Sequence, residues 1–160
     1  VARLSRDLEN IQYIKESSQD LARVRDVIDA SEGGIKVYAG ERVVDSYLLG
    51  AIGYVNPYGN YIPYASHRIF DFLEEGRIDD ARQIQRLIDE VDHIIAEGHP
   101  TYGHQCYSKA LAAHRGHPVG DVRPPLTTFG DLGDEGEKRV AEILHVFGEL
   151  DALMEKLDSP

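Results

Sequence analysis

Lys15 has the clearest potential for covalent chemistry, because it stands at the carboxyl end of an apolar segment, residues 11–15, that predicts a buried strand. Side chains alternate along a strand, so Tyr13, Lys15 and Ser17 share one face. If this face points into a parallel α/β barrel, Lys15 lies at the rim of the barrel, where enzymes of this fold keep their reactive groups. Burial there disfavours the ammonium form and leaves a free amine that attacks keto groups. A solvated lysine at a strand end is the alternative, and spacing alone does not separate the two hypotheses.

The first half of the chain alternates strands with helices, which places Lys15 in a predicted parallel sheet. Short apolar segments predict strands at residues 11–15, 35–39 and 51–55. Ser17–Asp20 has the pattern of a capping box and predicts a helix that ends before Gly33. A second, short helix is expected from Val43 to about Gly50. This alternation with short connections is typical of parallel βαβ units.

From Pro63 onward the pattern predicts helices alone. The clearest helix carries its apolar side chains at helical spacing, namely Ile78, Ala81, Ile84, Leu87, Ile88, Val91, Ile94 and Ile95. Other helices are predicted to begin at Pro63, to span about Tyr102–His114, and to begin at about Glu135. Prolines within residues 118–129 predict an extended segment before the last helix.

The predicted sheet is incomplete. Three parallel strands leave open edges, and a parallel sheet needs both faces covered. A closed barrel of this type usually takes about 250 residues. We therefore expect the remaining strands to belong to residues upstream of Val1, and we expect a chain that begins without methionine to be processed or truncated.

The composition is that of an ordinary globular protein, with 42% apolar and 28% charged residues among 160. A net charge of −11 argues against nucleic acid or an anionic membrane surface as the main partner. No apolar run approaches the roughly 20 residues of a membrane span. The single cysteine, Cys106, cannot form an internal disulfide, so we expect a cytoplasmic protein.

Several segments, taken in order along the chain, resemble those of the dihydrodipicolinate synthase / N-acetylneuraminate lyase family. The matching segments are Tyr13–Ser18, Tyr38–Glu41, Leu49–Val55, Asn60, Ile78–Leu87 and Val122–Leu126. The resemblance implies an α/β fold, the C-terminal half of a (β/α)8 TIM barrel followed by a C-terminal helical appendage. Residues 1–76 would begin in the fifth helix and hold strands six to eight with their helices, and residues 77–160 would form the helical region.

The resemblance also implies roles for individual residues. Lys15 would form an imine with the 2-keto carbon of the substrate, Gly40 and Val55 would line the pocket, and Ser17 would make a polar contact. The family's Thr-Thr carboxylate-binding pair and proton-shuttling tyrosine would lie in an N-terminal barrel half that this chain lacks. A homotetramer or other homo-oligomer is expected by the same resemblance.

Neither a cofactor nor a metal is expected, because imine chemistry requires none. His99, His104, His114 and His117 lie close in the sequence, but the His114–His117 spacing lacks the Cys or carboxylate partners of familiar zinc signatures. Cys106 is interpreted as a small packing residue.

Departures from the synthase pattern bear on the substrate. Tyr58, Asn60 and residues 99–109 are more polar than usual for lysine-pathway synthases, which would suit a hydroxylated substrate. We therefore predict a Schiff-base lyase that dehydrates a 2-keto-3-deoxy sugar acid, such as L-2-keto-3-deoxyarabonate, to a semialdehyde. A 4-hydroxy-tetrahydrodipicolinate synthase or pyruvate-dependent aldolase is the alternative, and a non-catalytic barrel homologue is a further one.

Overall fold

The computed structural model describes residues 1–98 and 103–159. The chain divides into two compact units, which are described separately. The first consists of Val1–Asn56 with Ile69–Gln85, and the second of Pro57–Arg68 with Arg86–Pro160. The division between a barrel part and a helical part at residues 76 and 77 stays a prediction.

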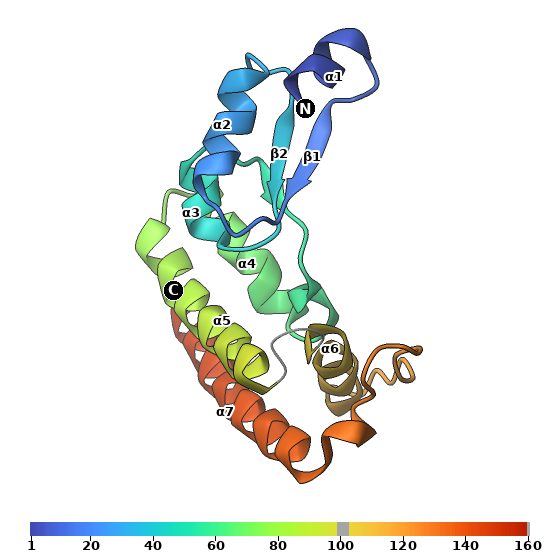
Figure 1. Cartoon of the computed structure of the whole chain (residues 1–160). Helices are drawn as coiled ribbons and strands as arrows, with labels where there is room; N and C mark the ends of the chain where they lie inside the picture. Colours follow the sequence, from blue (N-terminus) through green and yellow to red (C-terminus); the bar gives the residue numbers. More distant parts are fainter. Residues whose placement is uncertain (99–102, 160) are drawn as a thin grey trace. The chain divides into compact units, whose positions relative to one another are not determined.

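The first unit alternates helices with strands, as predicted (Figure 1). In chain order its complete elements are α1 (Ala2–Asp7), β1 (Tyr13–Glu16), α2 (Ala22–Ala30), β2 (Lys36–Ala39), α3 (Val43–Leu48) and β3 (Gly53–Tyr54). Within the described residues the strands form one sheet in the order β1-β2-β3, and both pairings are parallel. The prediction of parallel βαβ units is therefore confirmed, and β1 and β3 are the edges of this sheet.

The two faces of the sheet have different environments. Val37 and Ala39 of β2 are buried together with Val24 of α2, so this face forms the core of the unit. On the opposite face Tyr13 and Lys36 are exposed. The segment at residues 11–15 was predicted to be buried, but within this chain β1 alternates between exposed and half-buried residues, because the described helices pack on one face only.

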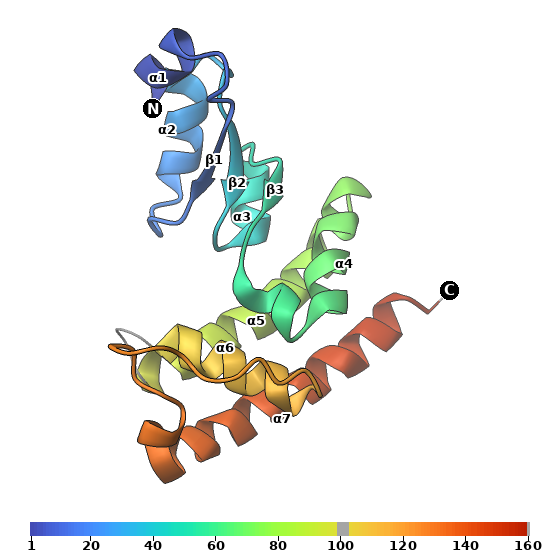
Figure 2. The same ribbon diagram turned by 90° about the vertical axis from the view of Figure 1, so that its right-hand side faces the viewer.

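Two further segments of the first unit extend the core. They belong to α4 (Pro63–Glu74) and α5 (Ile78–Gly98), each of which contributes residues to both units. The ring of Phe70 in α4 contacts Tyr47 edge-on, with centroids 5.6 Å apart, and also lies 6.1 Å from the ring of Tyr54. Figure 2 shows the three strands of this unit side by side.

The predicted capping box before α2 is wrong. The helix begins only at Ala22, whose backbone N–H donates to the Asp20 carboxylate at 3.2 Å. Gln19 has a positive φ of 65°, so the chain turns between Ser17 and the helix. The side chain that accepts a hydrogen bond from the first residue of the helix is therefore that of Asp20 and not that of Ser17.

The second unit is helical. It contains the 3₁₀ turn η1 (Pro57–Asn60), parts of α4 and α5, α6 (Gly103–His114), the 3₁₀ turn η2 (Gly130–Leu132) and α7 (Gly133–Leu157). The predicted helices are confirmed, apart from Tyr102, which lies outside the described residues, and residues 118–129 contain no helix. Among residues 1–98 and 103–159, no helix is both long enough and apolar enough to cross a membrane.

Aromatic and polar contacts fix the interior of the second unit. Tyr61 stacks on Phe147 of α7 with ring centroids 5.7 Å apart, and both rings are fully buried. The hydroxyl of Tyr58 donates to the carboxylate of Asp92 in α5. Burial, followed by the nearby Asp92 carboxylate, raises the pKa of Tyr61 above its ordinary value. The residues after β3 are thus anchored to helices of this unit.

Replacing Phe147 with alanine tests this anchor. We expect Phe147→Ala to lower the free energy of unfolding by about 3–5 kcal/mol, because it empties a buried aromatic site and removes the stack on Tyr61. Urea unfolding followed by circular dichroism measures the change. His145→Ala, on the exposed side of the same helix, is the matched control and should change stability by less than about 0.5 kcal/mol.

Candidate functional site

Lys15 lies on the open face of the sheet, near the carboxyl end of β1. Its register partner on β2 is Tyr38, and the partner of Tyr38 on β3 is Gly53. Because paired residues of neighbouring strands point to the same face, these three residues form one row across the sheet. The side chain of Lys15 is exposed within this chain.

Ser17 and Gly40 meet where β1 and β2 end. The backbone N–H of Gly40 donates to the carbonyl of Glu16 at 2.7 Å. A Cβ added at Gly40 would lie 1.7 Å from the Ser17 hydroxyl oxygen, so glycine is the residue that permits this approach. The hydroxyl of Ser17 thus lies directly beside the turn that follows β2.

Val55 follows β3 at the same edge. Its backbone N–H donates to the carbonyl of Ala39 at 2.8 Å, one residue before Gly40, and its side chain is 50% exposed. Lys15, Ser17, Gly40 and Val55 therefore all lie at the carboxyl ends of the parallel strands. This is the edge at which parallel α/β barrels carry their active sites. Their individual roles in catalysis and substrate binding stay predictions.

Sequence reasoning did not predict that Tyr38 and Gly53 lie in the same row of the sheet as Lys15. Both belong to predicted strands, and alternation places Tyr38 on one face of residues 35–39. The sequence alone does not give the register of the strands. The observed pairing of β1 with β2 sets Tyr38 level with Lys15. Glu16 is half-buried, and its carboxylate accepts a hydrogen bond from the Ser18 backbone N–H at 2.9 Å.

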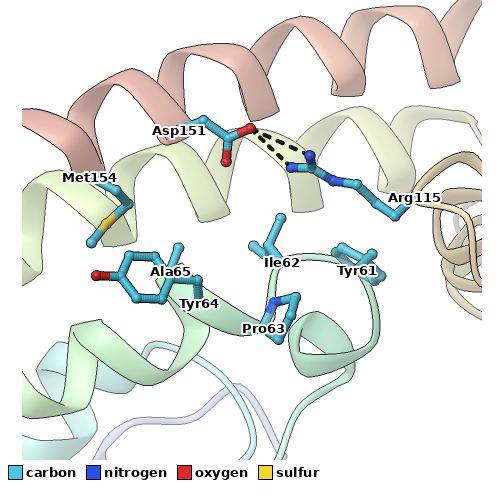
Figure 3. Close-up of a pocket in the computed structure, with 8 residues that line it drawn as sticks. All are labelled: Tyr61, Ile62, Pro63, Tyr64, Ala65, Arg115, Asp151 and Met154. Atoms are coloured by element: carbon cyan, nitrogen blue, oxygen red, sulfur yellow. Dashed lines mark hydrogen bonds and ion pairs between the residues drawn. The ribbon is translucent and has the colours of Figure 1, made fainter.

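The second unit contains a separate hollow of about 230 Å³ (Figure 3). Arg115 and Asp151 form an ion pair of 3.4 Å on one side of it, and Tyr64 and Met154 line another part. The guanidinium of Arg115 also lies 5.0 Å from the ring centre of Phe147. The eight described residues that line this hollow include no lysine.

The histidines do not assemble a metal site in the described structure. His104 is half-buried in α6, whereas His114 and His117 are exposed, and His99 lies outside the described residues. Residues 1–98 and 103–159 contain no group of three His, Cys, Asp or Glu side chains placed to hold a metal ion. Cys106 is buried in α6, and this burial raises the pKa of its thiol.

The chain is similar to proteins of one enzyme family. Residues 1–146 match the model of the dihydrodipicolinate synthetase family. The 4-hydroxy-tetrahydrodipicolinate synthase 1 of Streptomyces coelicolor is 32% identical over 136 residues, which cover 79% of this chain and 43% of the relative. The 4-hydroxy-tetrahydrodipicolinate synthase of Lactobacillus helveticus is 30% identical over 152 residues, which cover 94% of this chain and 46% of the relative.

The fold is similar to those of solved protein structures. A sialic acid aldolase of Ruminococcus gnavus, solved as a catalytic lysine mutant, superposes with a TM-score of 0.78 and 21% sequence identity. The match covers 92% of this chain and 48% of that structure. The prediction of an α/β fold, half of a barrel followed by helices, is confirmed, and the chain spans about half the length of the relatives it matches.

The contact between Ser17 and Gly40 makes a testable prediction. We expect Gly40→Ala to destabilise the protein by about 1–3 kcal/mol, because the added methyl group overlaps Ser17. The second substitution Ser17→Gly should recover part of this loss, while the carbonyl of Glu16 still lies 2.9 Å from the added atom. Gly148→Ala, where an added Cβ meets nothing within 4 Å, is the control and should not destabilise α7. Equal urea midpoints for Gly40→Ala and wild type would contradict the packing described.

Proposed function

Because the chain belongs to the dihydrodipicolinate synthetase family, we propose that Lys15 is the amine of a lyase that forms an imine with a 2-keto acid. The observation that carries this proposal is the position of Lys15 in the sheet. It lies at the carboxyl edge, on the face free of the described helices, and it is grouped there with Ser17 and Gly40. The Ruminococcus aldolase was solved as a catalytic lysine mutant, so a lysine is catalytic in that protein.

The proposed reaction begins with the free amine of Lys15. Its nitrogen attacks C2 of the keto acid, and the resulting carbinolamine takes up a proton and loses water to give a protonated imine. The positive nitrogen withdraws electrons, so a C3–H bond or the C3–C4 bond breaks more easily. Breaking either bond gives an enamine. Ser17, beside the turn after β2, is proposed to donate a hydrogen bond to the substrate, and Gly40 and Val55 are proposed to line the pocket.

The enamine has two candidate fates. It adds to an aldehyde in a synthase, and it expels a C4 hydroxyl in a dehydratase. The names of the relatives from Streptomyces and Lactobacillus support the synthase. In the proposed synthase reaction pyruvate is the keto acid and an aldehyde is the second substrate. The dehydratase hypothesis relied on polar groups that would face a hydroxylated substrate.

For the polar residues that it describes, the structure gives little support to the dehydratase hypothesis. Tyr58 is 2% exposed and its hydroxyl is engaged by Asp92, so it is not presented to a ligand. The amide nitrogen of Asn60 donates to the carbonyl of Pro57 within its own turn, at 3.0 Å. Residues 99–102 of the polar segment lie outside the described residues. We therefore favour the synthase and keep dehydration of a 2-keto-3-deoxy sugar acid as the second candidate.

An enclosed active site needs more strands than the three in the described sheet. The open face and the edges of β1 and β3 require cover, and we propose that further strands of a barrel provide it. A cytoplasmic location and a homo-oligomeric assembly are part of the same proposal. The expected partner is a small 2-keto acid.

Borohydride trapping tests the role of Lys15. Full-length protein incubated with pyruvate and borohydride should gain a reduced adduct on the peptide that contains Tyr13–Ser18, as read by mass spectrometry. Lys15→Ala should abolish the adduct while leaving the circular dichroism spectrum unchanged, because an exposed lysine contributes little packing. Lys36→Ala removes a lysine from the same face of the neighbouring strand and is the matched control, which should trap normally. An adduct on another lysine would contradict the assignment of Lys15 as the imine-forming residue.

Substrate assays separate the two candidate reactions. Full-length protein should consume pyruvate only when aspartate semialdehyde is also present, because the enamine of a synthase needs an aldehyde to attack. The parallel assay supplies a 2-keto-3-deoxy pentonate alone and follows release of a semialdehyde. Turnover in the second assay and not in the first would establish the dehydratase and reject the synthase, with the imine at Lys15 unaffected.

A further inference from the structure

The hollow of about 230 Å³ in the helical unit is a second concave place on the chain, and the imine chemistry does not use it. Three segments converge on it, namely the start of α4 with the two residues before it, Arg115 directly after α6, and the second half of α7 (Figure 3). All of its lining residues belong to the second unit. Sites for drug-sized ligands usually measure about 300–1,000 Å³, so this hollow suits only a small molecule.

One part of the hollow is apolar. Ile62, Ala65 and Met154 line it, and each is only 4% exposed. Tyr64 also lines the hollow, and its hydroxyl donates to the carboxylate of Asp158 at 2.6 Å, which fixes the direction of the ring. This part of the hollow therefore favours a short apolar group.

The polar part is the ion pair of Arg115 with Asp151, and its geometry is loose. Both terminal nitrogens of Arg115 lie 3.4 Å from the same oxygen, Oδ2 of Asp151. Charge-assisted hydrogen bonds are usually about 2.7–2.9 Å long, and an arginine fork commonly binds both oxygens of a carboxylate. The pair thus uses only part of the binding capacity of each group.

The two charged groups are also accessible to a ligand. The side chain of Asp151 is 62% exposed and that of Arg115 is 33% exposed. The guanidinium of Arg115 lies 5.0 Å from the ring centre of Phe147, a buried residue of α7, and this contact holds the cation beside the hollow. A positive and a negative group therefore stand side by side at an apolar hollow.

We infer that this hollow binds a small zwitterion, an α-amino acid with an aliphatic side chain. Its carboxylate binds Arg115, its ammonium binds Asp151, and its side chain lies against Met154 and Ala65. Charge complementarity selects this class, because a carboxylate alone meets the like charge of Asp151 and an amine alone meets that of Arg115. The inference concerns a site other than Lys15 and does not depend on the proposed reaction.

Calorimetric titration of the full-length protein with L-leucine tests the inference. Two matched compounds carry the same alkyl group: 4-methylpentanoate lacks the ammonium, and 3-methylbutylamine lacks the carboxylate. We expect saturable binding of leucine at millimolar concentrations and at least about tenfold weaker binding of each analogue, since each loses one charged hydrogen bond. Absence of leucine binding, or equal binding of either analogue, overturns the inference.

Substitutions locate the binding site. Asp151→Asn keeps the shape of the side chain and removes its charge, so the affinity for leucine should fall by at least about tenfold. Arg115→Gln should have an effect of the same size. Glu142→Gln alters another acidic residue of α7, outside the hollow, and is the matched control that should bind leucine as the wild type does.

The variants also give the results that reject the site. An unchanged affinity in Asp151→Asn overturns the inference, and this exposed substitution should leave the circular dichroism spectrum unchanged. If Arg115→Gln does not fold, Asp151→Asn decides. Lys15→Ala should bind leucine normally, and loss of binding in that variant would place leucine at the imine site and overturn the inference.

Discussion

The parallel pairing of β1 with β2 is the constraint on which the candidate site depends. It sets Lys15 level with Tyr38 and ends in the 2.7 Å hydrogen bond from the Gly40 N–H to the Glu16 carbonyl. A slip of one residue would turn Lys15 toward the helix-covered face, because strand side chains alternate. The same pairing brings the hydroxyl of Ser17 against Gly40. Register thus determines which groups surround the amine.

The different environments of the two faces of the sheet follow from this register. Val37 and Ala39 are directed to the α2 side and form the core with Val24. Lys15 and Tyr38 are directed to the side that the described helices leave uncovered. The core of this unit therefore lies on one face, and the proposed chemistry lies on the other. A barrel encloses that second face, which is how such a sheet combines an apolar outer layer with a polar reactive rim.

Local patterns in the sequence were sufficient for the three strands and the main helices, and they placed Tyr13 and Lys15 on one face of β1. Apolar runs predicted the strands, and helical spacing predicted α5 with Ile84 and Ile88 buried. Local patterns do not predict contacts between residues that lie far apart in the sequence. The neighbours of Ser17 in the sequence fit the pattern of a helix cap, but Ser17 lies against Gly40, where only a glycine leaves it space. Tyr58 was named among the polar residues that would suit a hydroxylated substrate, and no local pattern predicts its hydrogen bond to Asp92, 34 positions away.

A crystal structure of the full-length protein soaked with pyruvate tests the central claim most directly. The account predicts continuous electron density from Nζ of Lys15 to C2 of the keto acid, with the ligand at the carboxyl edge beside Ser17 and Gly40. Pyruvate bound at another lysine, or a Lys15 side chain turned away from an occupied pocket, would contradict it.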